Sequence, residues 1–373
     1  MFVRSGVINR VMNSFSTGNK DRMLISTGAT SRLCTAMSSS HEVYCNGLFL
    51  SARWFVFSQA ARSGVHVIIL PDKEKAEYCA ADLYNLIEGD KVFFLPSSGK
   101  GIERSNYKSS LEVQRTAAIG RILSREGDLT VAVTYPDALK EGIPDMKSLS
   151  EAAITIRPGD EISFDTLSGR LISEGFEKVD FVSAPGQFAI RGSIIDIFSF
   201  SSSDPYRISF WGDEVEEIMF FDCNTQFSKE KCDKADIISD IVAAGDEATL
   251  DISGIFPDDT VIWLDSSDMY SHEEFFTSYG RFRKVFIDTP LSRDPEDSIH
   301  FKISPQPVFN KNFELLSADI TEKTERGYKV YIYGEKKSQL ERVKSILAQN
   351  GGILPEFVEG KNIHSGFIDG EQK

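Results

Sequence analysis

The sequence has few of the residues from which metal sites and disulfide frameworks are built. Its 373 residues include five cysteines and five histidines, and no two cysteines form a CxxC pair. The odd number and scattered positions of the cysteines argue against a disulfide framework and favour a reducing compartment. The histidines are equally dispersed, so we expect no structural zinc and no other metal site.

Long apolar runs and a basic surplus are also missing. No stretch approaches the roughly 20 apolar residues that a membrane-spanning helix needs, so we expect no membrane partner. Asp and Glu number 56 against 41 Lys and Arg, which gives a formal net charge of −15. Phosphate binding depends on dense Lys and Arg, so this composition argues against a broad nucleic-acid-binding surface. A place in a nucleic-acid pathway through a protein partner is still compatible with it.

The length and the fractions of hydrophobic and charged residues are typical of a multidomain globular chain. At ~100–200 residues per domain, the length corresponds to two to four domains. Hydrophobic residues make up 41% and charged residues 26%, which is ordinary for a chain with packed cores. Residues 1–40 differ, because they are rich in Ser and basic residues and have Asp21 as their single acid. This resembles a transit-peptide composition, but we interpret the segment as a poorly defined N-terminus.

Between residues 41 and 148, short apolar runs alternate with helical patterns. The β-branched runs Val65–Leu70 and Leu129–Thr134 predict buried strands, and Ala52–Ala61 and Lys73–Leu86 have the spacing of helices. Strands that alternate with helices predict a parallel sheet covered on both faces.

The pattern changes between residues 149 and 238, where strands follow one another with little helix. The predicted strands are Lys178–Val182, Gln187–Arg191, Ser193–Phe198, Tyr206–Trp211 and Val215–Phe221. Gly- and Pro-containing turns separate them, which favours an antiparallel α+β domain. The α/β pattern returns over 239–305, where Ser271–Tyr279 is predicted to be helical. Residues 306–373 are expected to form a small α/β domain that is cut short, with the strand Lys329–Tyr333 between helices at 309–326 and 336–350. The simplest topology is therefore an α/β domain interrupted by an antiparallel insertion and followed by a small α/β domain.

The first strand-to-helix turn, at residues 45–54, is the place where a nucleotide would bind. A P-loop reads GxxxxGK[ST], and its backbone N–H groups, Lys and hydroxyl hold the phosphates and Mg²⁺. Gly47 stands at the first glycine, but Ala52, Arg53 and Trp54 replace the Gly, the Lys and the Ser or Thr. Without the hydroxyl the metal ligand is lost, so we expect no ATP hydrolysis here. Taken alone, the segment fits an ordinary turn better than a degenerate nucleotide-binding loop.

The most specific pattern lies between residues 175 and 218. Residues 175–198 read GFEKVDFVSAPGQFAIRGSIIDIF, and residues 205–218 read PYRISFWGDEVEEI. This segment resembles the domain shared by the UvrB excision-repair helicases and the transcription-repair coupling factors (Mfd). In both families this domain docks onto the damage sensor UvrA.

Two features favour the coupling factors over UvrB. The P-loop is decayed, as in the N-terminal module of the coupling factors, and residues 97–110 leave no room for the Tyr-rich hairpin with which UvrB probes DNA. The resemblance covers residues 41–240 well and is weaker beyond them. It implies a degenerate RecA-like (P-loop NTPase-like) domain in two parts, 41–148 and 239–305, with a UvrA-binding-like domain inserted at 149–238.

The resemblance implies a non-catalytic N-terminal fragment of a bacterial, cytoplasmic coupling factor. Such a fragment recruits UvrA to RNA polymerase stalled at DNA lesions during transcription-coupled nucleotide excision repair. The parent would be an ATP-dependent DNA translocase, and its contacts with RNA polymerase and double-stranded DNA would lie outside this chain. ATP and Mg²⁺ would likewise bind only the missing motor domains, so no cofactor is expected here. The alternatives are a UvrB-like subunit with an active ATPase and damaged-DNA binding, and a generic α/β scaffold.

Strand alternation separates the side chains of Tyr206–Trp211 onto two faces. It assigns Tyr206, Ile208 and Phe210 to the core and leaves Arg207 and Trp211 exposed together. Arg and Trp are the residue types that most often anchor protein interfaces. A solvated strand face, with Trp211 covered by a neighbouring loop, is the alternative.

The resemblance assigns contacts with UvrA to Arg191, Arg207 and Trp211. Lys178 is a further candidate, because it stands where UvrB has an Arg that contacts UvrA. No residue is assigned a catalytic role.

Overall fold

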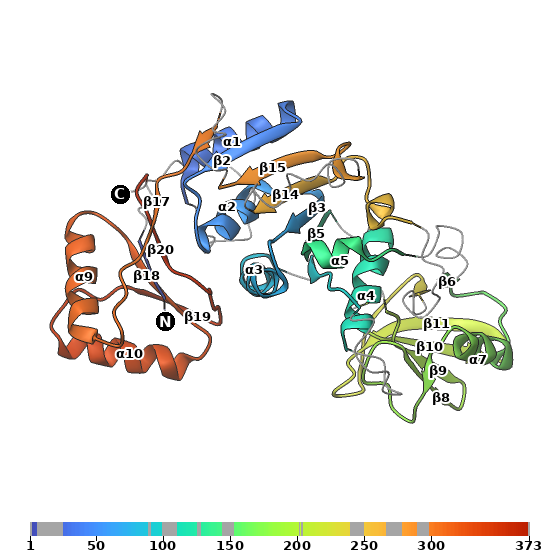
Figure 1. The fold of residues 1–373 in the computed structure, drawn as a ribbon. Helices are drawn as coiled ribbons and strands as arrows, with labels where there is room; N and C mark the ends of the chain where they lie inside the picture. Colours follow the sequence, from blue (N-terminus) through green and yellow to red (C-terminus); the bar gives the residue numbers. More distant parts are fainter. Residues whose placement is uncertain are drawn as a thin grey trace. The chain divides into compact units, whose positions relative to one another are not determined.

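The computed structural model describes the residues 2–5, 25–88, 91–98, 110–124, 128–143, 153–200, 202, 204–238, 250–265, 278–288 and 298–371. The chain divides into two compact units, Met1–Val92 with Asp258–Lys373, and Phe93–Pro257 (Figure 1). No helix in the described ranges is long and apolar enough to cross a lipid bilayer.

The first unit contains a parallel sheet, whose strands follow one another in the order β16-β2-β15-β14-β3. Their bounds are Glu42–Asn46 for β2, Gly64–Ile69 for β3, Val261–Asp265 for β14, Arg283–Ile287 for β15 and Ile299–His300 for β16. The strands β3 and β14 are almost entirely buried, as expected for runs of β-branched and aromatic side chains in a covered sheet. The large parallel sheet confirms the predicted α/β class.

Three helices of the first unit accompany these strands, namely α1 (Thr27–Ser39), α2 (Ala52–Ala60) and α3 (Lys73–Leu86). Helix α3 has the predicted bounds, and its N-cap Asp72 accepts a hydrogen bond from the Lys75 N–H at 2.8 Å. Helix α1 was not predicted. Its Ala29, Thr30 and Leu33 are buried on one side, but the Ser-rich sequence obscures that pattern.

A second sheet of the first unit is built from both ends of the sequence, in the order β17-β20-β1-β18-β19. The strands are β1 (Phe2–Ser5), β17 (Ile303–Pro305), β18 (Val330–Gly334), β19 (Glu356–Glu359) and β20 (Phe367–Asp369). Helices α9 (Phe313–Glu325) and α10 (Lys337–Gln349) pack on β18 around a core that includes Leu316, Ile320 and Ile332. The sequence predicts β18 and both helices, but not β1, which lies within the segment 1–40, nor β19 and β20.

The second unit begins with short α/β elements. These are β4 (Val92–Phe94, which starts at the boundary), α4 (Ser110–Ser124), β5 (Leu129–Thr134), α5 (Pro136–Lys140) and the 3₁₀ turn η1 (Ile252–Ile255). Strand β5 has the predicted bounds and is buried along its whole length. Most of the loop 97–110 and most of the predicted helix Ser271–Tyr279 lie outside the described residues.

The rest of the second unit is a strand-rich domain. Its main sheet has the order β12-β11-β10-β9-β8-β7, and all neighbours are antiparallel except β7 and β8. The bounds are Glu177–Lys178 for β7, Gln187–Arg191 for β8, Ile194–Ile197 for β9, Tyr206–Trp211 for β10, Glu214–Phe221 for β11 and Ser228–Lys231 for β12. The mostly antiparallel strands predicted for this region are confirmed.

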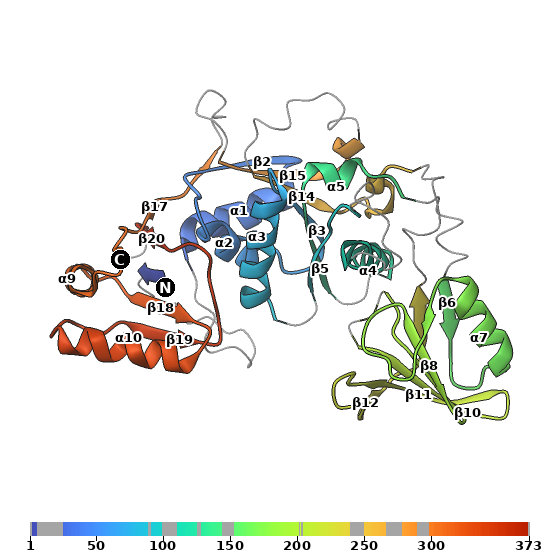
Figure 2. The same cartoon turned by 60° about the horizontal axis from the view of Figure 1, so that its bottom comes forward.

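One face of this sheet is the domain core. Helix α7 (Phe164–Ser173) and the strand pair β6 (Ala153–Ile156) and β13 (Ala235–Ile238) contribute side chains to it, and Figures 1 and 2 show α7 and β6 lying against the sheet. The sheet side of the core includes Phe188, Ile195 and Ile208. The opposite side of the sheet is called the outer face below.

The predicted strand Lys178–Val182 is wrong over most of its length. Strand β7 ends at Lys178, and the chain then crosses the outer face before it enters β8. Val182 is buried there in a small cluster with Ala189 and Phe221. The turn back into β8 needs Gly186, because its φ is +82° and a Cβ atom would lie 2.4 Å from the Phe200 ring.

Candidate protein-binding face

Strand β10 presents Trp211 to solvent. Tyr206, Ile208 and Phe210 are buried in the core, so the predicted alternation of this strand is confirmed. Trp211 is 79% exposed, which excludes the alternative in which a loop covers it. Because the strand alternates, Arg207 and Trp211 belong to the outer face, four residues apart on one strand.

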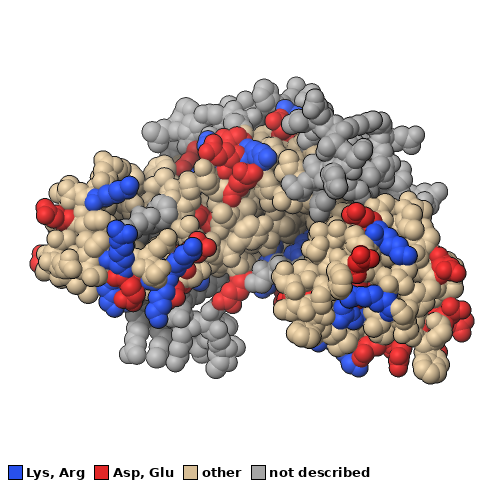
Figure 3. Space-filling model, turned by 90° about the horizontal axis from the view of Figure 1, so that it is seen from below, with Lys and Arg blue, Asp and Glu red and all other residues tan. Residues whose placement is uncertain are grey.

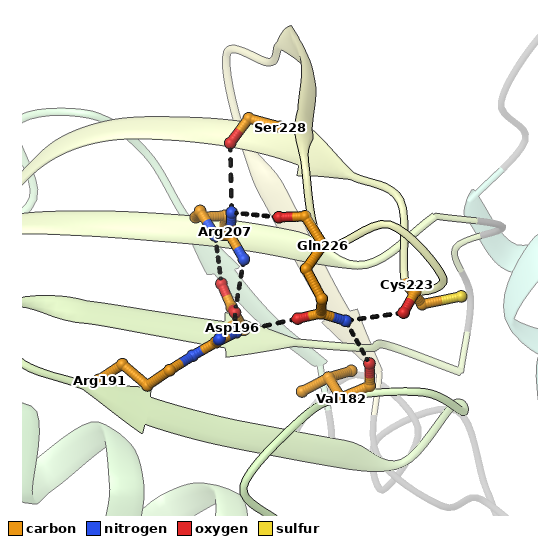
Figure 4. A network of polar contacts seen from close by, with 7 residues as sticks. All are labelled: Val182, Arg191, Asp196, Arg207, Cys223, Gln226 and Ser228. Carbon is orange, nitrogen blue, oxygen red and sulfur yellow. Dashed lines mark hydrogen bonds and ion pairs between the residues drawn. The ribbon is translucent and has the colours of Figure 1, made fainter.

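A buried carboxylate organises the outer face (Figure 4). Asp196 lies on β9, directly opposite Arg207 on β10, and its side chain is fully buried. Arg207 binds it in a bidentate manner, with Nε donating to Oδ1 at 2.7 Å and Nη2 donating to Oδ2 at 2.9 Å. Arg191 Nη2 donates to the same Oδ2 atom. Two guanidinium groups therefore share one buried aspartate.

Arg207 is consequently less available than the sequence analysis expected. Its side chain is only 16% exposed, and its Nη1 donates to the Gln226 carbonyl at 3.0 Å. The Cζ atom also lies 4.5 Å from the centroid of the Phe221 ring. The hydrogen bonds to Asp196 raise the pKa of Arg207 above its usual value. The expectation of an uncovered guanidinium is therefore wrong for Arg207, which holds strands β9 and β10 together.

Arg191 retains free hydrogen-bonding capacity. Its side chain is 36% exposed, and only Nη2 is engaged, by Asp196 and by Gln226 Oε1 at 3.1 Å. Within the described residues, Nε and Nη1 of Arg191 donate no hydrogen bond. A guanidinium that is held at one end and open at the other is suited to bind a carboxylate of a partner.

Gln226 links the network to the surrounding loops. Its Nε2 donates to the carbonyls of Val182, at 3.3 Å, and Cys223, at 2.7 Å (Figure 4). Neither Asp196 nor Gln226 was predicted from the sequence. Asp196 had a signal, because a single Asp within the apolar run Ile194–Phe198 needs a charged partner. Gln226 lies in a turn, and no feature of the sequence indicated its role in the network.

Lys178 is not part of this network. It lies on the edge strand β7, three strands from β10 in the sheet, and pairs in register with Phe188. Its role as a contact residue stays a prediction. The face of the domain seen in Figure 3 shows Lys and Arg side chains interspersed with Asp and Glu, so basic groups do not form one continuous area there.

The turn between β2 and α2 packs closely against other parts of the first unit. Gly47 has a φ of +71°, and a Cβ atom there would lie 2.3 Å from the Phe301 carbonyl oxygen. Ala52 is the first residue of α2, and Trp54 is buried in the core rather than placed over the turn. The described residues contain no group of three or more His, Cys, Asp and Glu side chains suited to a metal.

Two carboxylates of the chain accept hydrogen bonds from groups of this turn. Arg53, at the place of the P-loop lysine, donates to Asp265 at the end of β14 with a distance of 2.6 Å. The Leu48 N–H donates to Asp288 Oδ1 at 3.1 Å. Burial is the main cause that raises the pKa of Asp288, from 3.8 to about 7. Arg53 and the Leu48 N–H of this turn are thus bound to the protein's own acids.

Comparison with known proteins finds a family model that matches the strand-rich domain. A family model described as the UvrB interaction domain matches residues 154–240, which include the whole main sheet. This region of the chain is therefore similar to the UvrB interaction domain. The buried Asp196, the two arginines and Trp211 all lie within the matched residues.

Individual relatives agree with this result. The chain is 32% identical over 188 residues to the transcription-repair-coupling factor of Bacillus subtilis, which is 49% of this chain and 16% of that protein. A transcription-repair-coupling factor of Mycobacterium bovis is 32% identical over 190 residues, or 49% of this chain and 15% of the relative. UvrABC system protein B of Streptococcus uberis is 32% identical over 127 residues, covering 34% of this chain and 19% of the relative. The chain thus spans less than a fifth of each of these relatives.

Proposed function

We propose that this chain is a non-catalytic recruitment module of a transcription-repair coupling factor and that its UvrB interaction domain binds UvrA. The module would act in the bacterial cytoplasm, in transcription-coupled nucleotide excision repair. Contacts with RNA polymerase and double-stranded DNA, and the ATP-driven motor, would belong to other parts of the parent protein. The similarity to coupling factors over about half of the chain supports this assignment.

The outer face of the UvrB interaction domain carries the proposal. An exposed Trp211 and the open edge of Arg191 project from one rigid sheet, and Trp and Arg are the residue types most enriched at binding hot spots. Arg207 supports the face from within, because it fixes Asp196 and through it Arg191. We therefore assign direct contact to Arg191 and Trp211 and a positioning role to Arg207.

The internal partners of the β2–α2 turn support the non-catalytic part of the proposal. Arg53 is paired with Asp265, and the Leu48 N–H is paired with Asp288, so binding a triphosphate would require both interactions to break. The UvrB-like alternative, with an active ATPase, requires those groups to be available.

Titration of the chain with purified UvrA tests the proposal. Arg191→Ala and Trp211→Ala should each cost about 2 kcal/mol of binding free energy, a Kd roughly 30-fold weaker. Arg326→Ala is the matched control, because Arg326 is an exposed arginine just after α9 in the other unit. Wild-type affinity in both outer-face variants, or failure of the unmodified chain to bind UvrA, would overturn the proposal.

A further inference from the structure

Two exposed phenylalanines lie next to the Asp196 network, and neither was singled out by the sequence. Phe181 is 62% exposed and Phe227 is 76% exposed. Phe181 lies at the Arg191 end of the network, where the Arg191 Cζ atom is 5.0 Å from its ring centroid. Phe227 follows Gln226, whose carbonyl accepts a hydrogen bond from Arg207. Two large exposed apolar residues on the loops that flank one fixed charged network are candidates for an interaction surface.

The loop that carries Phe181 is fixed to the domain. Its neighbour Val182 is fully buried, and the Val182 carbonyl accepts a hydrogen bond from Gln226 Nε2. On the other side of the loop, the Ser183 and Ala184 N–H groups donate to Gln187 Oε1 at 3.0 and 3.1 Å. Phe181 therefore cannot fold back into the core without breaking these contacts.

The turn that carries Phe227 is fixed equally well. The Asp222 carboxylate accepts hydrogen bonds from the N–H groups of Asn224 and Thr225, both at 2.9 Å, and these bonds lower the pKa of Asp222. Gln226 has a φ of +62°, and the Asp222 N–H donates to the Phe227 carbonyl at 2.9 Å. The backbone thus holds the Phe227 side chain in solvent.

One residue couples the two loops. Gln226 binds the Val182 carbonyl of the first loop, the Cys223 carbonyl of the second and the Arg191 guanidinium between them in the network. The side chains of Phe181, Arg191 and Phe227 are therefore displayed by a single pre-organised unit. Pre-organisation lowers the entropy that a partner must overcome, which favours a binding surface over accidental exposure.

We propose that Phe181 and Phe227 are aromatic anchors of the docking surface, and that the partner presents a carboxylate to Arg191 with apolar side chains beside it. This rests on the proposed function, and the partner is UvrA. The two guanidinium groups of the network face a single internal carboxylate, so one positive charge is left over. The Arg191 side chain is partly exposed, and its Nε and Nη1 donors make no hydrogen bond within the described residues. The guanidinium lies next to the Phe181 ring. An acidic group flanked by apolar surface complements this arrangement.

Alanine variants test the aromatic part. Phe181→Ala and Phe227→Ala should each weaken the affinity for UvrA at least tenfold while the melting temperature of the chain stays unchanged, because both rings are largely exposed. Ile172→Ala is the matched control, because Ile172 is an exposed apolar residue on α7, the helix that covers the core face. If both variants bind like the unmodified chain while Arg191→Ala and Trp211→Ala are impaired, this inference fails and the proposed function stands. If the unmodified chain does not bind UvrA, both fail.

A charge pair at one position tests the acidic part. Phe227→Glu and Phe227→Lys both remove the ring but introduce opposite charges next to the network. A partner carboxylate predicts that Phe227→Glu binds UvrA at least fivefold more weakly than Phe227→Lys at low salt, and that the difference shrinks as the ionic strength rises. Equal affinities, or weaker binding by Phe227→Lys, would overturn the assignment of an acidic partner group.

Discussion

Arg191 and Arg207 bind the same carboxylate, but their surroundings give them different tasks. Arg207 uses Nε, Nη1 and Nη2 within the domain, whereas Arg191 donates to described residues through Nη2 alone. Asp196 is fully buried, so loss of these partners leaves its carboxylate oxygens without compensating hydrogen bonds. Variants of the two arginines should therefore differ in stability as well as in binding.

Arg207→Ala should destabilise the strand-rich domain by about 3 kcal/mol, because it leaves the buried Asp196 carboxylate without its bidentate partner. Chemical unfolding followed by circular dichroism measures this change. Arg191→Ala should destabilise the domain less, since Arg207 still neutralises the aspartate. Arg207→Lys should rescue only part of the loss, because an ammonium group cannot reproduce the bidentate geometry. A larger loss in Arg191→Ala than in Arg207→Ala would contradict this division of roles.

Asp288 gives the first unit a specific pH dependence. Burial raises its pKa to about 7, while the Leu48 N–H and the charge of Arg53 offset only part of that shift. Between pH values of about 4 and 7, the folded chain therefore holds more protons at this carboxyl than the unfolded chain does. The free energy of unfolding therefore falls as the pH rises through that range. Above pH 7 the folded chain bears the full cost of burying the ionised Asp288 carboxylate.

Asp288→Asn should remove this penalty. The amide oxygen keeps the acceptor for the Leu48 N–H, and Asn tolerates the φ of +53° found at this position. The variant should melt at a higher temperature than the unmodified chain at pH 8 and at a similar temperature at pH 5. Asp258→Asn, at an exposed aspartate of the same unit, is the control and should show no such difference. An equal shift at both pH values would rule out titration of Asp288 as the cause.

At the scale of elements, the sequence predicts strands well where one face is buried. Strand β10 and helix α3 have the predicted bounds, because their apolar residues follow the period of the element. The prediction fails after β7, where the apolar residues Val179, Phe181 and Val182 suggest that the strand continues. In the structure these residues form a loop, in which Val179 and Val182 pack on the outer face and Phe181 is exposed. Periodicity alone cannot separate these cases, because the contacts that fix the loop come from Gln226, far along the sequence.

The candidate site was predictable to a similar extent. Trp211 follows from strand alternation together with its residue type, and the structure leaves it exposed. The pairing of Arg207 with Asp196 depends on the register of β9 and β10, which no local pattern specifies. The exposure of Phe181 and Phe227 depends on two loops that side-chain hydrogen bonds hold in place. The residue types were visible in the sequence, whereas the shared partners were not.

The turn between β2 and α2 yields a prediction of its own. A titration with Mg-ATP should show no saturable binding, because Arg53 and the Leu48 N–H are already engaged by Asp265 and Asp288. Arg53→Ala should leave that result unchanged. Saturable, magnesium-dependent binding by the unmodified chain that is lost in Arg53→Ala would favour the UvrB-like alternative instead.

At the scale of the whole molecule, the net charge of −15 makes the proposed docking surface distinctive. An acidic chain repels nucleic acid and acidic partners over long distances, so we expect the one unbalanced guanidinium of the Asp196 network to give binding its selectivity. In the second unit, the core around α7 and the buried Asp196 network make this face a stable platform. The first unit contributes no residue to the proposed contact.

Hydrogen–deuterium exchange of the chain with and without UvrA tests the central claim most directly. We predict slower exchange on binding in the loops 179–186 and 222–228 and in the hairpin 211–214, which carry Phe181, Phe227 and Trp211. Exchange in α9 and α10 of the first unit should not change. Protection confined to the first unit or to α7, with the outer face unaffected, would contradict the account.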